Sequence, residues 1–176
     1  MRMRRNKTTP QHIQWQNIRV VSCFMKDLYG NDLKDVEIDP TKIILLDLNY
    51  TLISNSWTNT GSMADRIPRE KYETELLEMI KDNFVILITA RPVKYKEETL
   101  KNIKRKTGFT PNDSYWNIGM EPPKIKEYWL NEAIFPKYGD DPSQYYGIES
   151  NPRTRSMYKK YKIKSDRKEE LMAKYQ

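Results

Sequence analysis

The chain has 176 residues, of which 38% are hydrophobic, so it is long enough to bury the core of one domain. Lys and Arg number 31 against 24 Asp and Glu, and the formal net charge of +7 favours acidic partners such as phosphates or nucleic acid. A single cysteine excludes an internal disulfide, a single histidine argues against a His-based triad or zinc site, and the sequence lacks the roughly 20 consecutive apolar residues of a membrane-spanning helix. We therefore expect a cytoplasmic protein with no membrane partner.

The first 40 residues differ in composition from the rest of the chain. Basic residues crowd the segment 1–7, which precedes Pro10. Between Gln11 and Leu28 apolar residues recur at helical spacing, and Gly30 follows as a stop signal. We therefore predict a basic tail and an N-terminal amphipathic helix over residues 1–40, a domain core over residues 41–165, and a charged C-terminal tail over residues 166–176.

A four-residue apolar run organises the predicted core. Residues 43–46 show no polar alternation, which is typical of a strand covered on both faces in the middle of a parallel sheet. The run is followed by Asp47 and then by polar Asn49 and Thr51. Ligands of open α/β sheets bind beyond the carboxyl ends of the strands, so Asp47 is a candidate reactive residue. An aspartate that caps the next turn is the alternative interpretation.

Helical and strand-like segments alternate through the rest of the core, and Gly, Pro and Asn mark most of the boundaries. The predicted order is a loop over 54–69, a helix over 69–81, a strand over 84–88 followed by Thr89, a turn over 90–92, a helix over 94–106, a short strand over 115–118, a helix over 124–135, a strand over 144–148 followed by Glu149, a helix over 152–160 and a last strand over 161–163. This alternation predicts one α/β domain with right-handed crossovers and a parallel sheet.

Polar residues at three strand ends indicate one kind of chemistry. In a parallel sheet Asp47, Thr89 and Glu149 lie at the same edge. A carboxylate can attack phosphorus when a divalent cation offsets the repulsion between two anions, and carboxylates supply the hard oxygens that Mg²⁺ prefers. Thr89 and the amides of the following turn can hold phosphate oxygens. The pattern therefore favours phosphoryl transfer through an aspartyl intermediate, although a helix cap or a turn carboxylate explains each residue taken singly.

Four segments in order resemble a known family. Residues 47–52 (DLNYTL) resemble the first motif of the haloacid dehalogenase-like (HAD) phosphatase superfamily, whose pattern is Asp-x-Asp-x-Thr. Residues 87–92 (LITARP) resemble its second motif, Lys126 stands where the third-motif lysine is expected, and residues 146–152 (YGIESNP) resemble its acidic fourth motif. The resemblance spans about residues 42–163. Its last three motifs are most similar to the 3′-phosphatase domain of phage-type polynucleotide kinase–phosphatases.

The resemblance implies a single three-layer Rossmann-like domain with a parallel sheet and no large cap. It also implies Mg²⁺ as the cofactor and a phosphorylated substrate. The implied catalytic residues are Asp47, Asn49, Thr89 and Lys126, the phosphate-binding residues are Thr89, Ala90, Arg91 and Lys126, and the metal ligands are Asp47, Asn49 through its carbonyl, and Glu149. Lys124 competes with Lys126 for the phosphate role.

Two departures from the family pattern leave two functions open. Asn49 replaces the aspartate that serves as the family's general acid–base, a loss that typically costs about 10²–10⁴ in rate, and Ser150 is neutral where a second acid is usual. The first function is a phosphatase for a phosphomonoester, with a nucleotide or a nucleic-acid end as candidates. The second is a non-catalytic HAD-fold protein that binds nucleic acid or a protein partner. Stacking on a nucleobase and simple packing are both open for the aromatic residues Tyr50, Trp57, Tyr115 and Trp116.

Overall fold

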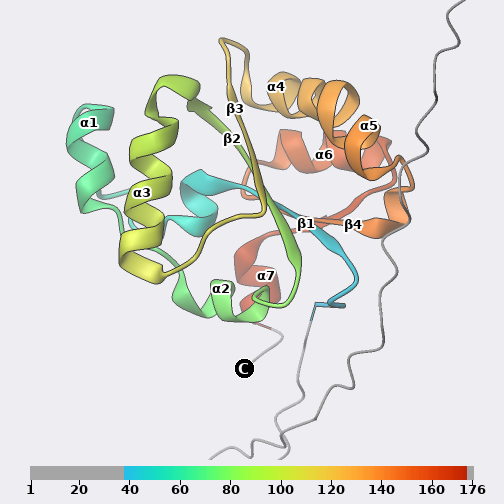
Figure 1. The fold of residues 1–176 in the computed structure, drawn as a ribbon, viewed down its shortest axis with the longest axis horizontal. Helices are drawn as coiled ribbons and strands as arrows, with labels where there is room; N and C mark the ends of the chain where they lie inside the picture. Colours follow the sequence, from blue (N-terminus) through green and yellow to red (C-terminus); the bar gives the residue numbers. More distant parts are fainter. Residues whose placement is uncertain (1–37, 174–176) are drawn as a thin grey trace, which may run out of the picture. The chain divides into compact units, whose positions relative to one another are not determined.

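A computed structural model describes residues 38–173 of the chain (Figure 1). The basic tail and the helix predicted between residues 11 and 28 lie outside the described residues. Within them, no helix is long and apolar enough to cross a membrane.

Five parallel strands form one sheet with the order β3-β2-β1-β4-β5. The strands are β1 (Ile43–Leu46), β2 (Phe84–Pro92), β3 (Asp113–Asn117), β4 (Tyr145–Ile148) and β5 (Lys164–Asp166). Leu46 at the end of β1 lies opposite Leu87 of β2 and Ile148 of β4. Asp47 after β1 and Glu149 after β4 therefore meet at one edge of the sheet, and Thr89 lies within β2, two residues beyond the position that pairs with the end of β1.

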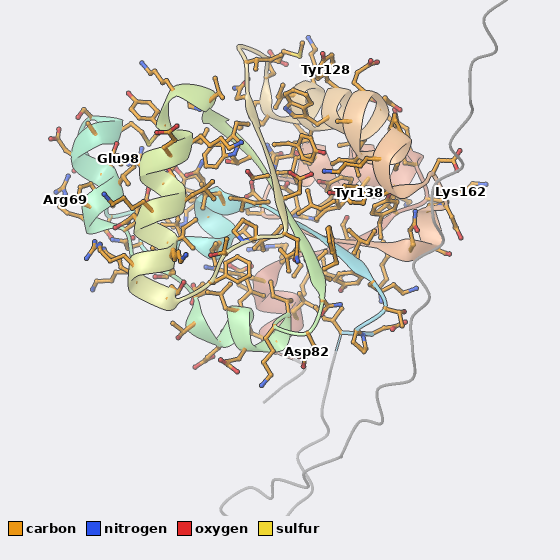
Figure 2. All side chains as sticks on the ribbon, in the orientation of Figure 1. Arg69, Asp82, Glu98, Tyr128, Tyr138 and Lys162 are labelled. Carbon is orange, nitrogen blue, oxygen red and sulfur yellow. The ribbon has the colours of Figure 1, made fainter. Side chains whose placement is uncertain are left out.

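Helices cover both faces of the sheet, and each face has its own apolar core (Figure 1). The helices are α1 (Met63–Arg66), α2 (Thr74–Met79), α3 (Lys96–Thr107), α4 (Pro122–Trp129), α5 (Phe135–Tyr138), α6 (Pro152–Lys160) and α7 (Lys168–Met172). Ile44 and Leu46 pack in the core that α2, α3 and α7 share, whereas Leu45 packs in the core beneath the segment from α4 to α6. Charged side chains such as Asp82 and Glu98 remain exposed (Figure 2). The predicted α/β class is confirmed as a five-stranded parallel sheet flanked by helices.

The segment between β1 and α2 differs from its prediction. The stretch 54–69, expected to be a loop, contains α1, whose first turn is capped by the Ser62 hydroxyl accepting from the Asp65 amide at 3.3 Å. The helix expected from residue 69 begins only at Thr74, because the preceding residues are extended and Tyr72 bridges to Ile53. Extended pairing with the chain after β1 thus displaces the helix start.

Two strand boundaries are also shifted. Residues 90–92, expected to form a turn, belong to β2, and the register against β3 is irregular between Ile88 and Pro92. The last strand, expected over residues 161–163, begins at Lys164 instead. Lys162 has a positive φ of 59°, and the Ile163 amide donates to the Tyr158 carbonyl at 3.0 Å. Ile163 therefore closes the end of α6 and joins the core instead of the sheet.

Candidate active site

A buried lysine joins the carboxylates that follow β1 and β4. The Lys126 Nζ atom donates to Asp47 Oδ1 at 2.6 Å and to Glu149 Oε2 at 2.5 Å. Asp47 is 6% exposed, and Lys126 and Glu149 are 1% exposed. Pro122 and Pro123 open α4 and place Lys126 on its buried side, whereas Lys124 is an exposed residue 3.9 Å from Glu121. The structure thus brings Lys126, and not Lys124, to Asp47.

The charges of Lys126, Asp47 and Glu149 shift the pKa values of Lys126 and Glu149. Burial lowers the pKa of Lys126, but the carboxylates of Asp47 and Glu149 outweigh burial and hold this pKa above its ordinary value. Burial and the charge of Asp47 raise the pKa of Glu149 to about 7, against the opposing effect of Lys126. The cluster therefore keeps its lysine cationic at neutral pH and holds one carboxylate close to its titration point.

The turn Leu48–Leu52 follows Asp47 at the sheet edge, and its backbone departs from helical angles at Asn49 and at Tyr50, which has a positive φ of 62°. The Asp47 amide donates to the Ile148 carbonyl at 3.0 Å, and the Thr51 hydroxyl donates to Asp47 Oδ2 at 2.9 Å. Leu48 and Leu52 are fully buried and anchor the turn in the core. Backbone, hydroxyl and ammonium contacts therefore fix both oxygens of Asp47.

Two oxygen acceptors converge on the hydroxyl of Ser150. Ser150 Oγ lies 3.3 Å from Asp47 Oδ2 and 3.3 Å from the Asn49 carbonyl oxygen. A hydroxyl has one proton, so it satisfies only one of these oxygens fully. Asp47, the Asn49 carbonyl and Glu149 are the oxygen ligands that the sequence predicts for Mg²⁺, which binds through one or two carboxylates and retains several waters. Residues 38–173 contain no cluster of three or more His, Cys, Asp or Glu side chains fit for a metal, so a bound Mg²⁺ would depend on those waters.

Residues at the end of β2 occupy the neighbouring position. Thr89 is fully buried, and its Oγ1 atom accepts from the Arg91 amide at 3.1 Å, which leaves the hydroxyl proton available to another acceptor. The Ala90 carbonyl accepts from Asn117 at 3.1 Å. Thr89 and Ala90 thus lie in β2 just beyond its last pair with β1, and within residues 38–173 neither forms a hydrogen bond with Asp47.

Arg91 is directed into the protein and contacts the side chain of Asn49. Its guanidinium is 1% exposed and forms an ion pair of 2.5 Å with Glu70, which is equally buried. It also donates to Thr99 Oγ1 at 2.8 Å and to Asn49 Oδ1 at 3.0 Å. The phosphate contact predicted for Arg91 remains a prediction, since each terminal nitrogen already donates to protein groups.

Sequence reasoning did not identify Glu70 and Thr99. Glu70 stands in a charged stretch, PREK, where nothing in the sequence marks one carboxylate as buried. Thr99 lies in α3 among lysines and glutamates. Only a count of the partners that a buried arginine requires would have pointed to an acid and a hydroxyl of this kind.

The four aromatic candidates separate into two classes. Trp57 is 82% exposed, and its ring lies 4.5 Å from that of Tyr50, which is 38% exposed and adjoins Asn49 in the chain. Trp116 is 2% exposed and belongs to the core, and Tyr115 packs against Trp129. Packing therefore explains Tyr115 and Trp116, while Tyr50 and Trp57 leave ring surface accessible.

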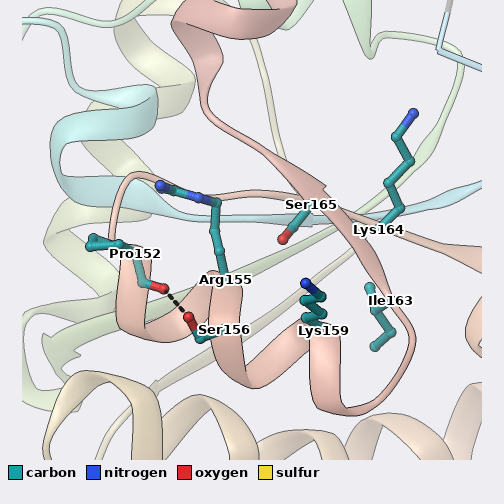
Figure 3. A pocket seen from close by; sticks show the side chains of 7 residues that line it. All are labelled: Pro152, Arg155, Ser156, Lys159, Ile163, Lys164 and Ser165. Atoms are coloured by element: carbon teal, nitrogen blue, oxygen red, sulfur yellow. Dashed lines mark hydrogen bonds between the residues drawn. The ribbon is translucent and has the colours of Figure 1, made fainter.

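An open basic cavity of about 380 Å³ adjoins the loop that carries Glu149 (Figure 3). Its walls are Pro152, Arg155, Ser156, Lys159, Ile163, Lys164 and Ser165. Arg155 donates to the carbonyls of Glu149 at 2.9 Å and Ser150 at 2.7 Å. Arg155 thus lines the cavity and also holds the backbone of Glu149 and Ser150 in the site.

Comparisons with known proteins show a similarity to solved structures. No protein-family model matches the chain, and no curated protein matches it. Among solved structures, the chain is similar to a chain of the Pnkp1/Rnl/Hen1 RNA repair complex, with a TM-score of 0.53 and 18% sequence identity. The similarity covers 72% of this chain and 42% of that chain, so this chain spans less than half of the length of its neighbour. At this identity the similarity shows a shared fold alone.

Proposed function

We propose that the chain is a Mg²⁺-dependent, HAD-like phosphatase that acts on a phosphomonoester through an aspartyl-phosphate at Asp47. One observation carries the proposal: the buried Lys126 ammonium joins Asp47 and Glu149 at the carboxyl edge of the sheet. Lysine side chains are almost never fully buried unless they are paired. Lys126 offsets negative charge at the position where an anionic substrate would meet the Asp47 carboxylate.

The residues of the site support a division of roles. One Asp47 carboxylate oxygen attacks the phosphorus, and the bond between phosphorus and the leaving oxygen breaks with its electron pair on that oxygen. Lys126 reduces the repulsion between Asp47 and the phosphoryl group, and the Thr89 hydroxyl donates to a phosphoryl oxygen. Asp47, the Asn49 carbonyl and Glu149 would hold Mg²⁺, which supplies charge neutralisation at the phosphoryl oxygens when it is bound.

Two observations support a substrate class. The neighbour in the solved structures belongs to an RNA repair complex, and the net charge of +7 favours polyanions. A nucleotide or a nucleic-acid end is therefore the substrate that we propose to test first.

Asn49 favours a second candidate function. An amide neither donates a proton to a leaving oxygen nor removes one from water, and Ser150 is neutral beside it. A HAD-fold protein that binds nucleic acid or a protein partner without turnover would tolerate both residues. If the partner is nucleic acid, the affinity should fall steeply with salt because counterion release drives such binding.

Phosphate release from a phosphomonoester in Mg²⁺, with intact-mass detection of an adduct, separates the two functions. The wild type should release phosphate or carry a phosphoryl group, and Asp47→Asn should do neither. Asp82→Asn is the matched control and should behave as wild type, because this exposed carboxylate precedes the start of β2 and so lies at the opposite edge of the sheet from the site. A wild type that forms no adduct and releases no phosphate would establish the binding protein as the better candidate.

A further inference from the structure

The seven residues that line the open cavity between α6 and β5 are basic or uncharged (Figure 3). Arg155 and Lys159 line it from α6, and Ser165 lines it from β5. The side chain of Lys164 extends away from the other labelled residues, and its ammonium lies 5.6 Å from the centre of the Tyr146 ring. The positive charge of the cavity therefore comes from Arg155 and Lys159.

Three side chains of the cavity have hydrogen-bond donors that the described part of the protein does not use. Arg155 donates to two backbone carbonyls through Nη1, whereas its Nε and Nη2 atoms donate to no group within residues 38–173. In the same range Lys159 forms no ion pair and the Ser165 hydroxyl forms no hydrogen bond. Lys159 is exposed, and Arg155 and Ser165 are half-buried, so these donors are accessible to a ligand.

The arrangement of charges in the cavity favours an anion. Arg155 and Lys159 are four residues apart on one face of α6, a spacing at which like charges repel each other. No carboxylate belongs to the wall, and Asp166, which follows Ser165, accepts instead from the Tyr146 hydroxyl. Phosphate oxygens would relieve the repulsion, because a guanidinium and an ammonium both donate to them.

One residue connects this cavity to the candidate active site. The Ser150 carbonyl accepts from Arg155 at 2.7 Å, and Ser150 Oγ lies 3.3 Å from Asp47 Oδ2. One residue spans at most about 3.6 Å of chain, so the Arg155 guanidinium and Asp47 are on the order of 10 Å apart. Nucleotides of one strand are spaced by about 3.4 Å along a duplex axis, so about three of them cover this distance.

We infer that the cavity between α6 and β5 binds a backbone phosphate of a nucleic-acid strand, a few nucleotides from the strand end that reaches Asp47. Arg155 and Lys159 are the cations of this site, and Ser165 is its neutral donor. The separation from Asp47 favours a strand over a single nucleotide, and an open cavity lets the chain enter and leave. The inference goes beyond the proposed function, because it adds a second binding site that serves the phosphatase and the binding protein alike.

Binding of a labelled oligonucleotide to the full chain tests the inference. The probe is a fluorescein-labelled hexathymidylate without a terminal phosphate, and its dissociation constant is measured by fluorescence anisotropy without Mg²⁺ between about 50 and 200 mM salt. The variants are Lys159→Gln and Lys160→Gln. Lys160 is the matched control, because it is the next residue of α6, is exposed, loses the same charge and does not line the cavity. Arg155 is left in place because it also holds the backbone of the active site.

Lys159→Gln should weaken hexathymidylate binding by about tenfold, because a charge-assisted hydrogen bond to phosphate is lost. The slope of log K against log salt should become shallower by about 0.7, the change expected for one phosphate contact of a single strand. Lys160→Gln should change the affinity by less than about twofold and leave the slope as in the wild type. The basic residues 1–7 are present in every variant, and thermal unfolding reports whether each variant is folded.

Equal weakening by the two substitutions would overturn the inference, because the lysines would then act only through the general charge of the surface. Absence of hexathymidylate binding to the wild type at low salt would overturn it as well. Inorganic phosphate and thymidine monophosphate are added as competitors, and displacement of the probe by either at an equal concentration of phosphate groups would identify a site for small anions instead of a strand. Because the probe has no phosphomonoester, a chain that releases no phosphate would overturn the proposed function and leave this result unchanged.

Discussion

The buried lysine offers the most direct test of the site. In Lys126→Met, Asp47 and Glu149 lose the ammonium that lies 2.6 and 2.5 Å from them, and exposures of 6% and 1% leave little room for water to replace it. Breaking a buried ion pair by removing one partner costs about 3–5 kcal/mol. The upper part of this range is expected here, because one ammonium serves two carboxylates.

The loss should depend on pH with a defined sign. The pKa of Glu149 in the folded protein is about 7, above its ordinary value of 4.5, so this residue favours the folded state at low pH and opposes it as the pH rises through 7. Lys126 lowers this pKa, and its removal therefore strengthens the effect. The destabilisation of Lys126→Met should accordingly be larger at pH 8 than at pH 5.

Denaturant unfolding at the two pH values measures both quantities. Lys124→Met is the matched control, because Lys124 is on the same helix, its side chain is 73% exposed, and surface substitutions usually change stability by less than about 0.5 kcal/mol. Equal losses in the two variants, or a loss in Lys126→Met that does not change with pH, would refute the description of a buried, charge-coupled cluster.

Three further stability predictions concern residues outside the cluster. Gly147→Ala places a Cβ atom 2.9 Å from the Ser165 Cβ and should cost about 1–3 kcal/mol in thermal unfolding, part of which Ser165→Gly recovers. Burial raises the pKa of Asp113, but hydrogen bonds from a lysine, two tyrosines and a backbone amide outweigh it and hold this pKa below its ordinary value. Asp113→Asn should therefore cost about 1–3 kcal/mol at pH 7, and the cost should shrink as the pH falls through the lowered pKa and the folded wild type loses the same charge. Trp116→Ala should cost about 3–5 kcal/mol, whereas Trp57→Ala, at a side chain that is 82% exposed, should leave the free energy of unfolding within about 0.5 kcal/mol.

The sheet and the residues at its edge were predictable because they follow from local patterns. Continuous apolar runs mark strands that are covered on both faces, and parallel topology then brings Asp47, Thr89 and Glu149 to one edge without further information. Lys126 is predicted from its place in the motif that resembles the family. The structure explains why Lys126 and not Lys124 reaches Asp47. The α4 helix directs the Lys126 side chain into the protein and leaves the Lys124 side chain exposed.

The hydrogen bonds that link Asn49 to Arg91 and Arg91 to Glu70 could not be predicted in the same way. Glu70 and Arg91 are 21 residues apart and pair across the domain, and no local rule selects one charged residue of the PREK stretch for burial. The boundary errors have a related cause. The start of α2 is shifted by the bridge between Tyr72 and Ile53, and the start of β5 by the positive φ of Lys162. The periodicity of apolar residues in the sequence indicates neither a tertiary bridge nor a left-handed backbone angle.

The charges of the two buried clusters indicate why a phosphoryl ligand and a divalent cation should bind together. Asp47 and Glu149 carry −2 and Lys126 carries +1, so the cluster at the sheet edge has a net charge of −1 when all three are ionised, whereas Glu70 and Arg91 cancel. A phosphoryl group brings about −1.5 to −2 more, and two unit charges 4 Å apart interact by about 4 kcal/mol at a protein surface. The neutral donors Thr89 and Asn49 cannot offset this repulsion. If the site binds both ligands, each must therefore strengthen the binding of the other by the same factor, whichever of them is added first.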